Sequence, residues 1–193
     1  MSTPVLQKEQ RIPRRERKPA PLTASRPELL SGGSDADFRT LVHSMLAFST
    51  RLESVRAGFA RLVGLTPIQY TMLISVSHLE SDGAVSVNML ADHLQLSGAF
   101  VTIETGKLLR KGLLTKEPDS GDRRRVSLKT TPTARALLES LSPTQVAVND
   151  VLFDFLDASG FRQLLKMARQ MPSSANRALS LLHYLAEDKE RAR

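Results

Sequence analysis

Residues 86–130 decide the fold, and they read SVNMLADHLQLSGAFVTIETGKLLRKGLLTKEPDSGDRRRVSLKT. Residues 88–95 predict a short helix, because apolar side chains recur there at helical spacing. Three of them should face inward: Met89, Leu90 and Leu94. Ser97 then provides an N-cap for a second helix, which we expect to run to about Lys111 and to end at Gly112. The stretch therefore begins with two short helices joined by a tight turn.

A β-hairpin should follow the second helix. Residues 113–117 and 123–129 predict two short strands, and the turn between them, residues 118–122, is rich in Gly and Asp. Two short helices followed by a hairpin with basic residues near its tip are typical of a winged helix-turn-helix. The second helix of that arrangement can enter the major groove of DNA, which is wide enough for one helix.

Helical periodicity also marks the residues before this stretch. Eight apolar residues are spaced by three or four positions, as in a heptad seam: Phe38, Leu41, Met45, Phe48, Leu52, Val55, Phe59 and Leu62. A seam this regular predicts that part of the helix packs on a partner helix in a second subunit; packing within one chain is the alternative. Thr66 and Pro67 then begin a helix that reaches about Glu80. Val85 and Val87 form at most a very short strand.

After the hairpin, Thr131 and Pro132 begin a helix with a bend at Pro143 and an interruption at residues 159–160, and more helices follow to residue 186. We therefore expect a mainly α fold with a small β-hairpin wing, in which a winged helix-turn-helix is flanked by N- and C-terminal dimerisation helices. The expected domains are a disordered, basic, Pro-rich tail (residues 1–34), an N-terminal dimerisation helix (35–64), the winged helix-turn-helix (65–131) and C-terminal dimerisation helices (132–193).

Composition excludes several classes of protein. The 193 residues suffice for one domain of ordinary size, and no window approaches 18 uncharged apolar residues, so we expect no membrane span. The polar N-terminus is unlike a secretory signal, which favours a cytoplasmic protein. The absence of Cys excludes disulfides and thiolate metal sites, and four scattered His residues offer little for metal binding. With no motif typical of catalysis, we expect no enzyme activity, no cofactor and no metal.

Positive charge is concentrated in two places. The net charge of +7 indicates a polyanionic partner. Residues 1–34 carry seven basic and three acidic groups, and residues 97–130 carry eight basic and four acidic groups. Such focusing is typical of nucleic-acid binding. The tail is either an arm that contacts DNA or simply solvated.

Four motifs in residues 65–139 carry a resemblance: residues 65–70 (LTPIQY), 90–94 (LADHL), 107–114 (KLLRKGLL) and 122–128 (DRRRVSL). In this order and combination they resemble the MarR family of bacterial transcription regulators, whose plan the chain follows over residues 36–187. The resemblance implies a homodimer that binds a pseudo-palindromic operator with its recognition helices in major grooves about 10 bp apart. The sequence departs from the family's pattern at Ile103, where the recognition helix of the family often has a basic residue.

The second short helix is the expected recognition helix. Val101, Thr105 and Leu108 should face the core. The expected DNA-binding residues on this helix are Ser97, Ala99, Thr102, Ile103, Gly106, Lys107 and Arg110. Their surface is small and partly apolar and lacks an Asn or Gln that would read adenine, so we expect readout through shape and thymine methyl groups, with Lys107 or Arg110 on phosphate. Glu104 either accepts from cytosine or pairs with Lys107 or Lys111.

The wing supplies the other expected DNA contacts. Asp122 and Arg124 match the family's Asp-x-Arg pair, in which the carboxylate aims the guanidinium at the minor groove. Arg123 and Arg125 should contact phosphate or be solvated.

In the family, a small effector between the dimer helices and the winged domain releases DNA. The resemblance therefore implies a repressor released by an aromatic carboxylate, a phenol or an acyl-CoA thioester, with His43, Arg51 and Tyr70 as candidate ligand-binding residues. Ordinary surface placement is the alternative for each. Two other functions stay open: a ligand-independent architectural DNA-binding protein, and an adaptor that uses the winged domain for protein contact.

Overall fold

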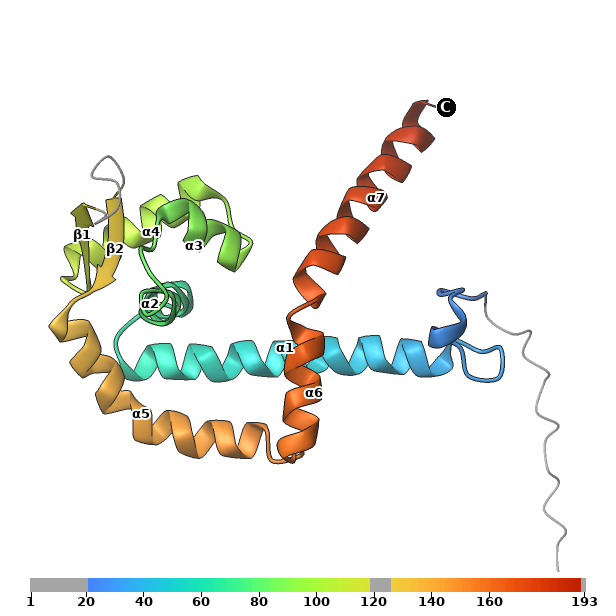
Figure 1. Ribbon diagram of the computed structural model, residues 1–193, viewed down its shortest axis with the longest axis horizontal. Helices are drawn as coiled ribbons and strands as arrows, with labels where there is room; N and C mark the ends of the chain where they lie inside the picture. The colour runs from blue at the N-terminus through green and yellow to red at the C-terminus, as the bar shows by residue number, and fades with distance from the viewer. Residues whose placement is uncertain (1–20, 119–125, 192–193) are drawn as a thin grey trace, which may run out of the picture. The chain divides into compact units, whose positions relative to one another are not determined.

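The computed structural model describes residues 21–118 and 126–191 (Figure 1). Its main elements follow one another as α1 (Ala36–Leu62), α2 (Pro67–Leu79), α3 (Val87–Leu94), α4 (Gly98–Arg110), β1 (Leu114–Pro118), β2 (Val126–Thr130), α5 (Pro132–Leu152), α6 (Ala158–Ala168) and α7 (Met171–Arg191). This order confirms the expected mainly α fold with a β-hairpin wing. The chain divides between Val55 and Arg56 into two compact units, which are described separately below.

The first unit contains a polar turn that precedes α1. Its centre is the buried carboxylate of Asp35, whose Oδ2 accepts hydrogen bonds of 2.6 Å from both the backbone N and the Oγ1 of Thr23. Arg39 Nη2 lies 2.9 Å from Asp35 Oδ1. These hydrogen bonds from Thr23, with a smaller contribution from Arg39, hold the pKa of Asp35 below its ordinary value.

The expectation of a disordered tail up to residue 34 does not hold for residues 21–34. They contain the 3₁₀ helix η1 (Pro27–Leu29) and a pair of backbone hydrogen bonds between Ser31 and Ser34. The reason is that one carboxylate collects several local partners, which amino-acid composition does not reveal. Residues 1–20, the rest of the expected tail, lie outside the described residues.

The apolar seam of α1 has two different ends. In the first unit, Leu41 and Met45 are 55% and 43% exposed, so this chain leaves that part of the seam in solvent. In the second unit, Phe59 is buried and its ring centroid lies 6.2 Å from that of Tyr70. The interpretation as packing within one chain is therefore right for Phe59, while the exposed end remains available for a partner.

The core of the second unit lies between α2, α3, α4 and the hairpin (Figure 1). Thr66 begins α2 with a capping box, since its Oγ1 accepts from Gln69 N and Gln69 Oε1 accepts from Thr66 N. The largest fully buried side chains come from α2, α3, α4 and the sheet: Tyr70, Met72, Leu73, Val76, Val85, Leu90, Val101, Leu108 and Leu128. Burial of this set holds α4 against α2 by the hydrophobic effect.

The hairpin pairs β1 and β2 in antiparallel register, from Leu114 opposite Thr130 to Pro118 opposite Val126. Val85 adds one bridge, because Leu128 N donates to Val85 O at 2.8 Å and Val85 N donates to Ser127 Oγ at 3.0 Å. The very short strand expected at Val85 is thus a single bridge to β2. The second strand was expected from residue 123; its described part begins at Val126, because residues 119–125 lie outside the described residues.

The C-terminal helices differ from the expectation in their breaks. Helix α5 contains Pro143 and bends along its length, as expected (Figure 1), and it ends at Leu152. The chain leaves helical conformation at residues 153–157 rather than at residues 159–160. Asp157 caps α6, with its Oδ1 accepting from Gly160 N at 2.7 Å, so Gly160 lies in the first turn of a helix. A side-chain cap upstream of a glycine lets a helix begin there, and a search for glycine breaks misses it.

The described residues of α6 and α7 contain no buried side chain. Among the described residues, no single helix is both long and apolar enough to cross a membrane, and only α1 and α2 taken together, across a bend of 89°, pass that test.

Candidate nucleic-acid interface

The turn between α3 and α4 has a defined geometry. Gln95 ends α3 in the left-handed region, with φ of 55°, and Leu96 N donates to Ala91 O at 3.0 Å. Ser97 then caps α4 by accepting from Phe100 N at 3.3 Å. This three-residue connection turns the chain sharply enough for α4 to follow α3 at once. Ser97 is therefore a structural cap, and its expected contact with DNA remains a prediction.

The rotation of α4 about its axis agrees with the sequence pattern. Val101, Thr105 and Leu108 are buried as expected, and the Thr105 hydroxyl donates to Val101 O at 2.7 Å. The opposite face is turned to solvent: Ala99, Thr102, Ile103 and Arg110 are exposed and Gly106 is partly exposed. The structure thus brings these five expected DNA-binding residues onto one side of one helix.

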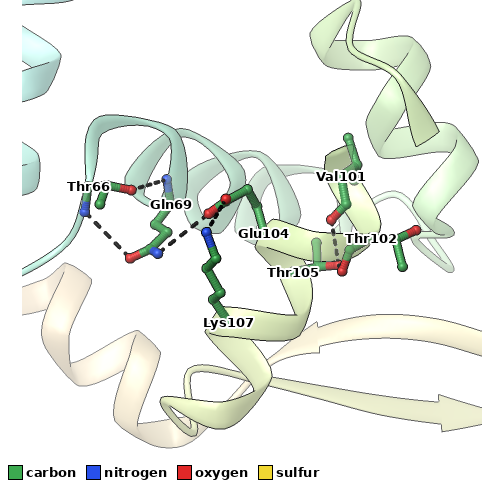
Figure 2. A network of polar contacts seen from close by, with 7 residues as sticks. All are labelled: Thr66, Gln69, Val101, Thr102, Glu104, Thr105 and Lys107. Carbon is green, nitrogen blue, oxygen red and sulfur yellow. Dashed lines mark hydrogen bonds and ion pairs between the residues drawn. The ribbon is translucent and has the colours of Figure 1, made fainter. Parts of the chain in front are cut away.

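Glu104 fixes that rotation (Figure 2). Its side chain is only 7% exposed and points toward the start of α2, where Gln69 Nε2 donates to Glu104 Oε2 at 3.5 Å. Lys107 Nζ donates to the other oxygen, Glu104 Oε1, at 2.5 Å. The carboxylate therefore joins α4 to the capping box of α2, which excludes it from accepting a hydrogen bond from cytosine and confirms the expected ion pair with Lys107.

The ion pair limits what Lys107 can do. Its ammonium group already bonds to Glu104, and its side chain is 43% exposed. Thr102 is limited in the same way, since its hydroxyl donates to Gly98 O at 2.8 Å. Arg110 is exposed at the end of the helix. Its guanidinium group lies close to Gly106, since a Cβ added at Gly106 would be 3.8 Å from Arg110 Nη1. The expected phosphate contact of Lys107 or Arg110 remains a prediction.

Apolar side chains stand beside these polar groups. Ile103 is 58% exposed and Phe100 is 40% exposed. Met89, expected to face inward from α3, is 46% exposed, and the buried residues of this helix are Leu90 and Ala91. Sequence reasoning missed Phe100; an aromatic residue in the first turn of a helix of otherwise small side chains was the available signal.

The wing has a described base and an undescribed tip. Lys129 Nζ lies 2.8 Å from Glu117 Oε2 across the two strands, and this hydrogen-bonded carboxylate raises the pKa of Lys129 above its ordinary value. Glu80, at the end of α2, binds the base of the wing: its carboxylate accepts hydrogen bonds from the backbone N of Thr130, at 2.8 Å, and from the Thr130 hydroxyl. The expected wing contacts Asp122, Arg123, Arg124 and Arg125 lie outside the described residues.

Of the three candidate ligand-binding residues, Tyr70 does not fit a position on a pocket surface. It is 1% exposed, and its hydroxyl accepts from Gln145 Nε2 at 2.8 Å. Burial raises the pKa of this phenol, against smaller opposing effects of Arg56 and Gln145. His43 and Arg51 are exposed on the part of α1 that belongs to the first unit.

Arg56 is a cation that sequence reasoning missed. Its guanidinium carbon lies 5.5 Å from the centre of the Tyr70 ring, and its Nη2 donates to Thr71 Oγ1 at 3.2 Å. Among the residues that the structure describes, no carboxylate lies within ion-pair distance of it. Arg56 follows Arg51 by five positions in a helix, so only the packing of α1 on α2 distinguishes the two.

A cleft lies where α5 passes into α6. The cleft has a volume of about 440 Å³ and combines aromatic and acidic side chains; its lining is Asn149, Asp150, Phe153, Leu156, Asp157, Ala158 and Phe161. Within the described ranges, no group of three or more His, Cys, Asp or Glu residues is arranged to hold a metal ion.

Residues 63–125 match the model of the MarR family. Among solved structures, the chain is similar to the transcription regulator MarR from Oenococcus oeni PSU-1, with a TM-score of 0.59 and 20% identity over 69% of this chain and 98% of that one. It is also similar to S. aureus MepR in a complex with DNA, with a TM-score of 0.53 and 21% identity over 77% and 99% of the two chains.

A third similar structure is that of Bordetella bronchiseptica BpsR, described as regulated in its DNA binding by 6-hydroxynicotinic acid. Its TM-score is 0.53, with 24% identity over 67% of this chain and 91% of that one. No curated protein sequence matches the chain. At these identities, the structural similarities establish a shared fold.

Proposed function

We propose that this chain, which carries the winged helix-turn-helix of the MarR family, is a transcription regulator that binds operator DNA. The observation that carries the proposal is the orientation of α4. Its inner face is buried, its rotation is held by Glu104, and its outer face is open to solvent over the whole length of the helix. A helix presented in this way has the size and exposure that major-groove readout needs.

In this proposal α4 lies in a major groove and the wing lies beside it. Ala99, Thr102, Ile103 and Gly106 approach base edges, and Arg110 contacts the phosphate backbone. Arg124, held by Asp122, reaches the minor groove, while Arg123 and Arg125 contact phosphate. Ser97 and Lys107, which the structure engages in a cap and an ion pair, contribute at the edge of this surface.

The proposed regulator is a homodimer. Large exposed patches of apolar side chains are typical of surfaces that bind another protein, so those on α6 and α7 support this assembly. They are Phe161, Leu165, Met167, Met171, Leu179, Leu181, Leu182, Tyr184 and Leu185. The exposed Leu41 and Met45 of α1 add to the same argument. Two copies would bind a pseudo-palindromic operator.

An anionic effector is the proposed signal, and its binding would release a repressor from DNA. Arg56 supports this part, since a partly buried guanidinium without a carboxylate partner among the described residues attracts an anion. The regulation of BpsR by an aromatic carboxylate provides a first compound to test. Arg56 replaces Arg51 as our first choice of anchor, because it contacts the core of the winged domain.

The alternative is an architectural DNA-binding protein without an effector. The net charge of +7 and the basic residues 1–34 favour it, because charge alone binds DNA without regard to sequence. It predicts equal affinity for unrelated duplexes.

Fluorescence anisotropy tests the proposal directly. The full chain is titrated into a duplex from upstream of its own gene and into a shuffled duplex of equal composition, each at two salt concentrations. We expect the native duplex to bind about a thousandfold more tightly. Arg124→Ala should lose much of this affinity, whereas Arg162→Ala, which removes an exposed charge from α6, should not. Equal binding of both duplexes that weakens together with salt would instead favour the architectural alternative.

A further inference from the structure

The outer face of α4 carries an unusual set of side chains for a helix that reads bases. Ala99, Ile103, Gly106 and Arg110 follow one another at spacings of four, three and four residues, so they share one side of the helix. Only the last of them carries a hydrogen-bond donor. Ile103, near the middle, is 58% exposed, and Phe100, three residues before it, is 40% exposed.

The polar groups next to this face are already engaged. The Thr102 hydroxyl donates to Gly98 O at 2.8 Å, and Lys107 donates to Glu104 at 2.5 Å. Ser97 Oγ accepts from the backbone of Phe100. Lys107 is the only long side chain with hydrogen-bond donors in the first three turns of α4, and its ion pair with Glu104 holds its ammonium group beside α2. The face formed by Ala99, Ile103 and Gly106 itself offers no side-chain donors for the bidentate reading of guanine or adenine.

The major groove offers one apolar group to such a surface. Thymine carries a methyl group on C5 at the floor of the groove, and the other three bases present only donors and acceptors there. A 5-methylcytosine carries a methyl group at the same ring position. An isoleucine and a phenylalanine gain free energy by removing such a methyl from water, and neither can satisfy a base's donors or acceptors.

On the basis of the proposed function, we propose that α4 recognises the 5-methyl groups of pyrimidines in the major groove, with Ile103 as the main contact and Phe100 beside it. DNA is the occupant that the surrounding charge favours, since residues 97–130 carry eight basic and four acidic groups and Arg110 ends the apolar face. The operator half-site should thus contain thymines that are read by their methyl groups and not only by their base pairing.

Base analogues test this inference without changing the protein. Each thymine of the bound duplex is replaced in turn by deoxyuracil, which lacks the methyl group and keeps the same pairing. At the contacted positions we expect about fourfold weaker binding per half-site, from the value of one buried methyl group. Replacing such a T·A pair by 5-methylcytosine·G should retain more affinity than replacing it by C·G.

A variant then assigns the effect to a side chain. In Ile103→Ala the penalty for deoxyuracil at the contacted position should become smaller, because the main partner of the methyl group is gone and only Phe100 remains beside it. Arg110→Gln is the matched control on the same face; it should weaken binding to the thymine and deoxyuracil duplexes by the same factor. Circular dichroism spectra of both variants should superimpose on that of the parent chain.

The outcomes distinguish failure of the methyl readout from failure of the proposed function. Sequence-specific binding that no deoxyuracil substitution weakens overturns the methyl readout and leaves the proposed regulator intact. An unchanged deoxyuracil penalty in Ile103→Ala also overturns the assignment to this face. Failure to prefer any duplex over its shuffled counterpart overturns the proposed function and, with it, the inference.

Discussion

At the scale of single residues, buried carboxylates organise both units. Glu104 joins α4 to α2 through Gln69 and Lys107, and Asp35 joins residues 21–34 to the start of α1 through Thr23. A buried charge is stable only when its oxygens are hydrogen-bonded, so each carboxylate selects one local arrangement. The hydrogen bonds of Glu104 fix the rotation of α4, the candidate recognition helix.

Replacing Glu104 by Ala should lower the free energy of unfolding by about 1–3 kcal/mol, because the Gln69 amide loses a buried acceptor. Urea denaturation followed by circular dichroism measures the change. Glu117→Ala is the matched control: its carboxylate also pairs with a lysine, but it is half-exposed, so the expected loss is under about 1 kcal/mol. Equal losses in the two variants would contradict the role assigned to Glu104.

Asp35 should make the turn before α1 sensitive to acid. Because the folded state lowers its pKa below the ordinary value of 3.8, its ionised form stabilises the turn. That contribution is complete above the ordinary pKa and is lost as the pH falls through the lower, folded value. The amide resonance of Thr23, followed by NMR from pH 6 to pH 2, should titrate with Asp35. In Asp35→Asn this titration should be absent, whereas Asp82→Asn should preserve it.

At the scale of secondary-structure elements, the starts of α2, α4 and α5 were predictable, whereas the end of α5 and the start of α6 were not. Thr66, Ser97 and Thr131 each cap a helix where the sequence predicts one, since a cap needs only the residue and the next three positions. The break after α5 was placed wrongly, at residues 159–160, because glycine permits a break but does not require one. Met89 was assigned to the wrong side of α3, since an eight-residue helix is too short for periodicity to define its buried face.

The capping box at the start of α2 should contribute measurably to the stability of the protein. Thr66→Ala removes the acceptor for Gln69 N and should destabilise the protein by about 1 kcal/mol. Differential scanning calorimetry would show this as a lower Tm. Thr133→Ala, an exposed position in the first turn of α5, should change the free energy of unfolding by less than about 0.5 kcal/mol. A Tm for Thr66→Ala as high as that of Thr133→Ala would argue against a stabilising capping box.

At the scale of the whole molecule, apolar side chains of the C-terminal helices remain exposed to solvent. No side chain of α6 or α7 is buried among the described residues, although these helices carry leucines at helical spacing. Amphipathic helices owe most of their stability in proteins to packing of the apolar face. The proposed second copy of the chain would satisfy that requirement and would give the two-fold symmetry that a pseudo-palindromic operator needs.

The chain should therefore sediment as a dimer at micromolar concentration. Leu179→Glu combined with Leu182→Glu places two charges on the apolar side of α7 and should shift the sedimentation equilibrium to monomer. The matched control is Ser173→Glu combined with Ser180→Glu, which adds the same charge on another side of the same helix and should leave the dimer intact. A monomer in the parent chain would rule out the proposed assembly.

The sequence by itself determined the order of the elements, the winged helix-turn-helix and the inward face of α4, because capping and periodicity are local and act over one or two helical turns. Only the tertiary structure decided the partners of long polar side chains. It paired Glu104 with Gln69, 35 residues away, and Tyr70 with Gln145, 75 residues away. It also turned Arg56 rather than Arg51 toward Tyr70. Side chains of this length reach several neighbours, and only the packing of one helix on another selects among them.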